Sequence, residues 1–325
     1  MKITVIAGGV GGARFVRGVR EHVRRSAEEH TIDVVVNTGD DWWLAGLRIW
    51  PDHDSILYTL AGQNDEERGW GRRGESERVS AELRTWGVTP EWFTLGDLDL
   101  GTHIARTAWL RAGETPTEVA RRLGARWDLG VTLHPATDDE IDTHIVTPDG
   151  ERLHFQEWWT RHRARMPVEQ FVQQGIEAAR PSPAALAAIA GADVILLAPS
   201  NPVVSIGPVL SIPGVRDALA AASAPIVGVS PIIGGAAVRG MAEACLAVID
   251  VAADAGAVAR HYGARGAGGV LDGWLVGEED AQAIAGIEAA GIAARTVPLW
   301  MKDADTSAAL AADALDLTLT LADVG

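Results

Sequence analysis

The fold class is decided by residues 2–12, whose sequence is KITVIAGGVGG. Residues 2–7 are apolar, largely β-branched and too few for a helix, so they predict a buried strand. After the glycines, residues 13–26 predict a helix with a basic outer face, and the apolar run 32–36 predicts a second strand. A strand, a glycine loop, a helix and a strand form a βαβ unit, which is built around a parallel sheet.

Strands and helices alternate again in the second half of the chain. The apolar runs 193–197 and 225–229 predict buried strands. Two extended runs, 144–146 and 152–159, flank a Thr-Pro-Asp-Gly turn and predict a β-hairpin. Helices are predicted at 168–179, 183–190, 236–255 and 280–291.

Residues 62–130 have a different composition, rich in charged and turn-forming residues. Helices are predicted near 76–86, 103–112 and 115–124. We therefore predict an α/β protein with a Rossmann-like, three-layer, mostly parallel sheet and a β-hairpin. Its core comprises residues 1–61 and 131–325, and residues 62–130 form a mainly helical insertion.

Composition excludes several classes of protein. The formal charge of −16, from 44 acidic and 28 basic residues, argues against nucleic acid or an anionic membrane as a partner. The single cysteine, Cys245, excludes internal disulfides and cysteine-cluster metal sites, and it fits a reducing compartment. We find no signal-peptide pattern after Met1 and no uninterrupted apolar span, so a cytoplasmic protein is expected.

Loops at the carboxyl ends of the predicted strands carry the residues suited to chemistry, because ligands bind there in open α/β sheets. Gly8, Gly9, Gly11 and Gly12 would let backbone N–H groups approach a diphosphate at a helix N-terminus. The dinucleotide pattern needs a glycine where Arg14 stands, and the P-loop pattern is absent. A tight turn without a ligand is the alternative.

Four aspartates follow the second predicted strand. Asp40 and Asp41 end the segment that starts at Asn37, and Asp52 and Asp54 precede the apolar helix 56–61. Singly, Asp40 could be a turn residue and Asp54 a helix cap. Together they would repel a diphosphate unless a divalent cation lay between, and Mg2+ takes one or two carboxylates plus phosphate oxygens. With no recognisable protein nucleophile, the pattern indicates metal-assisted phosphoryl transfer.

Small hydrogen-bonding residues end the two later strands. Ser200 and Asn201 follow the strand at 193–197, and Ser230, Pro231 and Ile232 follow the strand at 225–229. Such groups could read a nucleotide base or orient phosphates, or they could be ordinary strand-to-helix turns. The nine histidines show no metal-ligand spacing and are predicted to be surface or packing residues.

The motifs, taken in the order in which they occur along the chain, resemble those of the 2-phospho-L-lactate transferase family of coenzyme F420 biosynthesis. The resemblance extends from residue 1 to about residue 240 and rests on seven stretches: 8–13, 37–41, 51–62, 95–99 with Thr102 and His103, 155–157, 198–203 and 229–235. The family pattern often has a basic residue where this chain has Leu98, so no charge contact is carried over to that position.

The resemblance implies a transferase of the EC 2.7.8 type. It would move a phosphorylated three-carbon acid from a guanosine-diphosphate-activated donor to Fo, a deazaflavin, with release of GMP. The alanine-, arginine- and tryptophan-rich composition resembles actinobacterial members, for which the donor is phosphoenolpyruvyl. Archaeal members use the phospholactyl analogue, and the motifs do not separate the two. A homodimer is also implied.

Site roles follow from the resemblance and from the aspartate pattern. Mg2+ would lie on Asp40 and Asp54, and one of Asp41, Asp52 or Asp54 could accept the proton of the attacking hydroxyl. Phosphates would lie at Gly8–Gly12, Arg14 and Asn37. Guanine would lie near Ser200, Asn201, Ser230, Pro231 and Ile232, and Fo would lie beside Asp52, Asp54 and Thr94, under the insertion.

Two other classes of protein share parts of this pattern. A regulatory nucleotide-sugar-binding protein of the gluconeogenesis-factor type has a similar glycine loop, but the acidic segment 51–55 and the long insertion favour the transferase. An NAD-dependent oxidoreductase is disfavoured because the third glycine of its fingerprint is missing and no lone acid ends the second strand.

Overall fold

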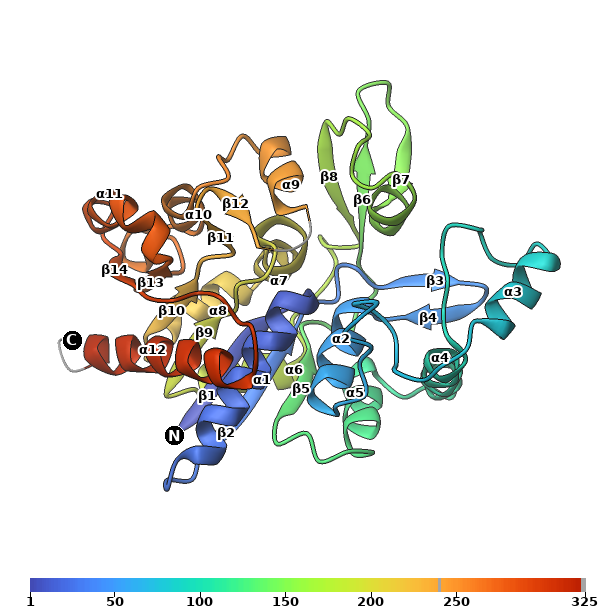
Figure 1. Ribbon diagram of the computed structural model, residues 1–325, viewed down its shortest axis with the longest axis horizontal. Helices are drawn as coiled ribbons and strands as arrows, with labels where there is room; N and C mark the ends of the chain where they lie inside the picture. Colours follow the sequence, from blue (N-terminus) through green and yellow to red (C-terminus); the bar gives the residue numbers. More distant parts are fainter. Residues whose placement is uncertain (239–240, 323–325) are drawn as a thin grey trace.

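A seven-stranded parallel sheet forms the centre of the computed structural model, which describes residues 1–238 and 241–322 (Figure 1). Every adjacent pair of strands in this sheet is parallel, which confirms the predicted fold class. The spatial order is β14 (Ala293–Thr296), β13 (Gly273–Val276), β10 (Ile226–Val229), β9 (Val194–Leu197), β1 (Lys2–Ala7), β2 (Thr31–Val36) and β5 (Thr132–Pro135).

Helices cover both faces of the sheet, so successive strand residues enter opposite cores. Val34 and Val36 of β2 belong to one apolar cluster and Val35 to the other. Because both faces are buried, the inner strands β9 and β10 are apolar throughout, as is usual for parallel sheets, whereas the edge strands β5 and β14 are only partly buried. One face carries α1 (Gly9–Arg25), α2 (Pro51–Leu60), α5 (Pro116–Gly124) and α12 (Ala304–Ala322); the other carries α6 (Pro183–Ala190), α7 (Gly207–Ser211), α8 (Val215–Ala221), α10 (Ala255–Tyr262) and α11 (Ile284–Ala289).

The insertion extends from the β2 side of the sheet (Figure 1). It contains α3 (Arg78–Thr85) and α4 (Asp97–Arg111), and α4 packs on a hairpin of β3 (Trp42–Leu44) and β4 (Leu47–Ile49). A separate apolar cluster that includes Trp42, Ile49 and Leu100 holds this part together. In contrast, α5 packs on β5 and contributes Val119 and Leu123 to the main core.

A small antiparallel sheet stands above the carboxyl edge of the central sheet (Figure 1). Its strands β6 (Asp142–Val146) and β7 (Arg152–His154) confirm the predicted hairpin. The extended run predicted over 152–159 is too long, because β7 ends at His154 and a π-helical turn, η1 (Glu157–Arg161), follows. The helix predicted over 168–179 is wrong, because β8 (Gln170–Gln174) pairs with β6 instead. Phe171 lies with Phe155 and Trp158 in an aromatic cluster, so tertiary packing overrides local propensity here.

Several helix boundaries also differ from the prediction. The helix predicted from residue 13 begins at Gly9, the one predicted from residue 103 begins at Asp97, and the one predicted from residue 56 begins at Pro51. The N-cap of α2 is Trp50, so Asp54 is not a helix cap.

The long helix predicted over 236–255 is wrong. The hairpin of β11 (Ile232–Ile233) and β12 (Ala236–Ala237) precedes the short α9 (Ala242–Val248), and Asp254 caps the separate α10. Residues 239–240 of the predicted helix lie outside the described residues. Alanine favours helix without specifying where a helix starts, and the aspartate cap sets the start of α10.

Within the described residues, no single helix has the length and apolar character needed to cross a membrane. A bent pair, 202–211 with 215–221, meets the criterion on length and composition alone, with an 81° bend.

Candidate active site

The sheet order reverses beside β1, and the predicted site loops meet there. The chain passes from β1 to β2 on one side, and β9 later pairs with β1 on the other. Such a reversal opens a crevice at the carboxyl ends of the strands, where ligands bind in this class of fold. The loops after β1 and β9 touch, because the Gly8 N–H donates to Ser200 Oγ at 3.2 Å and Ser200 Oγ donates to the Gly8 carbonyl at 2.7 Å.

Each glycine at the junction of β1 and α1 is required by close packing or by its backbone conformation. A Cβ on Gly8 would lie 2.3 Å from Asp52 Oδ2, one on Gly11 would lie 2.6 Å from the Pro199 carbonyl, and one on Gly12 would lie 2.7 Å from Ser200 Oγ. Gly9 has a φ of +62°, in the region that favours glycine. The fold therefore requires these glycines, and their binding of phosphate stays a prediction.

Asp52 ties three elements together. It accepts hydrogen bonds from Asn37 Nδ2 at 2.8 Å, from the Gly9 N–H and from Ser205. Asn37 in turn donates to the Val204 carbonyl and accepts from the Gly39 N–H. Burial raises the pKa of Asp52 to about 6, although these hydrogen bonds oppose the shift. Asp52 thus joins the starts of α1 and α2 to the loop after β2.

Asp40 and Asp41 lie buried in the loop after β2, and each has an oxygen without a donor. Gln156 Nε2 donates to Asp40 Oδ2 at 2.6 Å, but Asp40 Oδ1 and Asp41 Oδ1 have no hydrogen-bond partner. Burial, together with the charges of Asp52 and Asp41, raises the pKa of Asp40 well above its usual range. Burial also raises the pKa of Asp41, and the charges of Arg48 and Arg106 offset only part of that rise.

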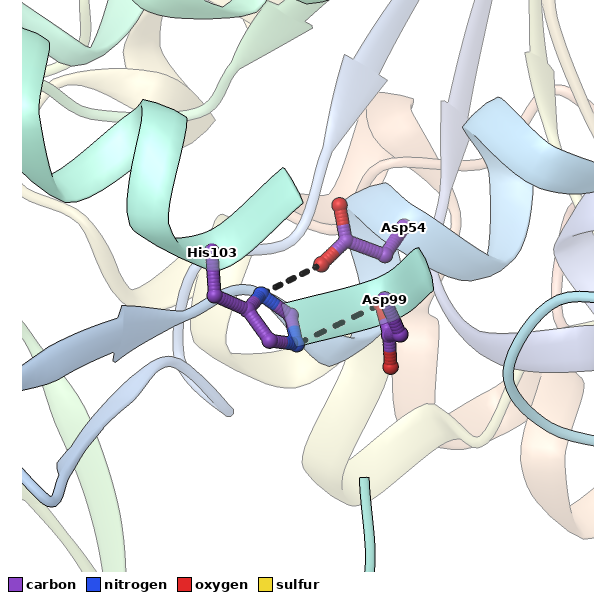
Figure 2. A group of neighbouring side chains, drawn as sticks. All are labelled: Asp54, Asp99 and His103. Carbon is purple, nitrogen blue, oxygen red and sulfur yellow. Dashed lines mark ion pairs between the residues drawn. The ribbon is translucent and has the colours of Figure 1, made fainter. Parts of the chain in front are cut away.

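Asp54, in contrast to Asp40, is paired with a positively charged side chain. Its Oδ1 accepts a short hydrogen bond from Arg106 Nη2 of α4, and its Oδ2 lies 3.6 Å from His103 Nδ1 (Figure 2). Burial alone would raise the pKa of Asp54, but the positive charge of Arg106 and a hydrogen bond from His53 hold it well below its usual range.

His103 lies between Asp54 and Asp99 (Figure 2). Arg106 Nη1 lies 2.9 Å from His103 Nδ1. Because a guanidinium can only donate, Nδ1 is the acceptor and the proton is on Nε2, 3.3 Å from Asp99 Oδ1. Asp99 also accepts from the Tyr58 hydroxyl at 2.7 Å. The ligand atoms of Asp54, Asp99 and His103 lie within 4.8 Å of one another, but Arg106 already supplies positive charge to this group.

Sequence similarity identifies the family of this chain. The family description "2-phospho-L-lactate transferase CofD" matches residues 3–300. The chain belongs to the CofD family. Relatives named phosphoenolpyruvate transferase are 51% identical in Thermobifida fusca, over 99% of both chains, and 51% identical in Streptomyces coelicolor, over 98% of both chains. A third, from Nocardia farcinica, is 49% identical over 97% of this chain and 94% of its own.

Among solved structures, the chain is similar to protein BH3568 from Bacillus halodurans. The TM-score is 0.62 over 96% of this chain and 98% of that chain, with 17% sequence identity. This likeness supports the fold alone.

Asp41 of this CofD-family chain opens onto a cavity of about 300 Å³. The loop after β2 contributes Thr38 and Asp41, the β3–β4 hairpin contributes Trp43 and Arg48, and α4 contributes Arg111. Thr38 Oγ1 is buried and has no partner, like Asp41 Oδ1. The insertion, through α4, therefore covers a space that begins at Asp41.

The other predicted binding residues of this family member are in or near the loops that meet at the site. Asn201 Oδ1 accepts from the Val203 and Val204 N–H groups and caps the π-helical turn η2 (Pro202–Ile206). Ser230 bonds to Ile232 within its own buried turn, which includes Pro231. Arg14 is half-buried on α1 and Thr94 is half-buried before α4. Contact of these residues with substrate stays a prediction.

The sequence did not indicate Arg106 as part of the CofD site and gave no role to Gln156, Asp99 or His103. A signal was present, because Asp99, His103 and Arg106 are spaced four and three residues apart and so share one face of α4. That face meets Asp54 of α2, and this pairing depends on how the insertion folds back.

Proposed function

We propose that this protein transfers the phosphoenolpyruvyl group from a guanosine-diphosphate-activated donor to Fo in coenzyme F420 biosynthesis, giving dehydro-F420-0 and GMP. The observation that carries the proposal is a set of buried aspartates with unpaired oxygens, placed where the sheet order reverses in a CofD-family chain. The names of the relatives favour the phosphoenolpyruvyl donor over the phospholactyl donor.

The aspartates fit Mg2+ as a cofactor. Among the residues that the structure describes, three buried carboxylate oxygens have no hydrogen-bond donor: Asp40 Oδ1, Asp41 Oδ1 and Asp54 Oδ2. Oxygen ligands of this kind suit a hard divalent cation. Asp40 and Asp54 would hold the ion, which would neutralise the diphosphate and the charge that develops on departing GMP.

Asp41 is the best candidate among the aspartates to accept the proton of the attacking hydroxyl. It lines the cavity and has a free oxygen, and burial raises its pKa. Asp52 is engaged by Asn37, Gly9 and Ser205, and Asp54 is held by Arg106. Positioning contributes most of the rate, because a loose phosphoryl transition state needs little help from a base.

The substrates would be held by the converging loops. The start of α1, from its N-cap Gly8 to Arg14, would bind phosphate oxygens at the positive end of the helix dipole. Guanine would lie toward Ser200, Asn201 and the Ser230 turn. Fo would lie beside Asp52, Asp54 and Thr94, with its hydroxyl toward the cavity that α4 covers.

The test is a product assay with purified protein, Fo, Mg2+ and the enolpyruvyl- or lactyl-activated guanosine diphosphate. We expect GMP and dehydro-F420-0 by mass spectrometry, faster product formation with the enolpyruvyl donor, and saturable Fo binding by fluorescence. Tight binding of a nucleotide-sugar with no turnover would contradict the transferase activity and would favour a regulatory nucleotide-sugar-binding protein. Light scattering would test the proposed homodimer.

A further inference from the structure

Arg106 is the feature of the site that the proposed chemistry leaves unused. Its side chain is fully buried, with 0% exposure. A buried charge is unfavourable unless it is paired and hydrogen-bonded, so a fully buried arginine indicates a specific partner.

The contacts of Arg106 converge on Asp54. Nη2 donates to Asp54 Oδ1, while Nη1 faces the Arg48 carbonyl at 3.2 Å and His103 Nδ1 at 2.9 Å. The guanidinium also lies over the Trp50 ring, 4.4 Å from its centre. The planar fork is thus fixed on several sides, while Asp54 Oδ2 keeps no hydrogen bond.

The balance of buried charges at the site explains what the contact between Arg106 and Asp54 does. Asp40, Asp41, Asp52 and Asp54 are all buried, and the buried arginines near them are Arg48 and Arg106. Without a cation or substrate, such a group of carboxylates repels itself. A guanidinium built into α4 reduces this repulsion at Asp54 and fixes the rotamer of that carboxylate.

We propose that Arg106 is a positioning residue and resident counter-ion for Asp54, holding one carboxylate oxygen so that the other stays available to a divalent cation. Through Arg106, α4 of the insertion sets the geometry of an acidic residue on α2. This inference rests on the proposed function only for its catalytic readout.

Two variants test the role. Arg106→Gln should lower kcat by about a hundredfold, as expected when the support of a metal ligand is lost, with little change in the Kd of Fo. Arg106→Lys should recover part of that loss, because the charge remains but the fork is lost. Arg106→Gln should also lower Tm by about 10 °C, because a buried carboxylate is left unpaired.

Two stability measurements separate a counter-ion from a packing residue. Millimolar Mg2+ should raise the Tm of Arg106→Gln more than that of the wild type, because the cation replaces the missing charge. The double variant Asp54→Asn with Arg106→Gln should be more stable than Arg106→Gln alone. Equal Mg2+ shifts, or a double variant no more stable than the single one, would overturn the proposal.

Arg20 offers a matched control. It is a buried arginine on α1 that donates to the Leu60 carbonyl at 2.6 Å and the Leu129 carbonyl at 3.2 Å. Arg20→Gln should lower Tm without an added response to Mg2+ and without a loss of kcat in the folded protein. If the wild type and Arg106→Gln both show measurable transfer and their kcat values are similar, the positioning role is refuted. Absence of any wild-type transfer would refute the proposed function, while the Tm comparisons would still decide the role of Arg106.

Discussion

Asp40 and Asp54 are both buried carboxylates at one site, yet the protein supports them in opposite ways. Asp40, after β2, is held at 2.6 Å by the neutral amide of Gln156 and has Asp41 and Asp52 as charged neighbours. Asp54, on α2, is held by the guanidinium of Arg106. The pKa of Asp40 is therefore raised by burial and like charges, whereas the pKa of Asp54 is lowered despite its burial.

The difference shows how one residue type can serve two purposes at one site. The charge of Asp54 is compensated before any ligand arrives, so this carboxylate has a fixed place and stays ionised. The charge of Asp40 has no cationic neighbour and that of Asp41 is offset only in part by Arg48 and Arg106, so that part of the site gains most from a cation. In the proposed function, the core side would supply the attraction for Mg2+, and the insertion side would supply the geometry.

The largest expected effect is on transfer, where the two carboxylates should behave alike. Asp40→Asn and Asp54→Asn should each lower kcat/KM at least a thousandfold, about 4 kcal/mol, because each removes an anionic ligand from the proposed Mg2+ site. Steady-state assays with Fo as acceptor measure this. Asp33→Asn, which alters an aspartate paired with His134 at 2.7 Å on the central sheet, is the control and should retain activity. Full turnover by either site variant would remove that residue from the mechanism.

Folding stability should then separate the two carboxylates. Asp54→Asn leaves Arg106 buried without its anion and should lower the free energy of unfolding by about 3–5 kcal/mol. Asp40→Asn removes a repelled charge and keeps an acceptor for Gln156, so it should be neutral or stabilising by about 1 kcal/mol. Urea unfolding of both variants in EDTA provides the comparison. Equal destabilisation would mean that their electrostatic supports do not differ.

The carboxylates at the strand ends could be predicted from sequence, but their supports could not. Apolar runs and the glycine loop place Asp40 and Asp41 after β2, because parallel strands end at one edge of the sheet. Gln156 reaches Asp40 from the helical turn after β7, across 116 positions, and Arg106 reaches Asp54 across 52 positions. Contacts at that separation depend on tertiary packing.

The errors in the fold prediction have the same origin. Residues 170–174 are predicted to be helical, and their strand exists because β6 offers a partner and Phe155 offers a packing surface. The strands β1, β2, β9 and β10 were predicted because both faces of the parallel sheet are buried there, which gives a largely apolar pattern. The strands β5, β13 and β14 were not predicted, and the edge strands β5 and β14 are only partly buried. Local pattern thus determined the middle of the sheet, and the peripheral elements that complete the site were determined by packing.

The pH dependence of stability should differ in sign between Asp52 and Asp54. The folded pKa of Asp52, about 6 against a usual 3.8, means that its contribution is present below the unfolded pKa and is lost as the pH rises through 6. That loss is roughly 3 kcal/mol. The lowered pKa of Asp54 means that its contribution is present above the unfolded pKa and is lost as the pH falls through that range toward the folded pKa.

Denaturant unfolding in EDTA from acidic to neutral pH tests this contrast. Asp52→Asn should remove much of the stability loss that the wild type shows as the pH rises, because its amide keeps an acceptor oxygen for Asn37 without titrating. Asp54→Asn should instead reduce the loss on the acid side. Identical pH profiles for the wild type and Asp52→Asn would contradict the assignment of this loss to Asp52.

The smallest effect should come from giving Asp40 a cationic partner in place of the neutral Gln156, as Asp54 has in Arg106. Gln156→Lys places a cation beside Asp40 Oδ2, so the carboxylate is compensated in advance and should attract Mg2+ about tenfold less strongly. Gln156→Met has a similar length without the charge or the N–H donor, and it isolates the loss of the hydrogen bond. Calorimetric Mg2+ titrations of both variants give the ratio of their affinities. If lysine and methionine weaken Mg2+ binding equally, the Gln156 amide matters for orientation alone, and the charge contrast between the two supports does not govern metal binding.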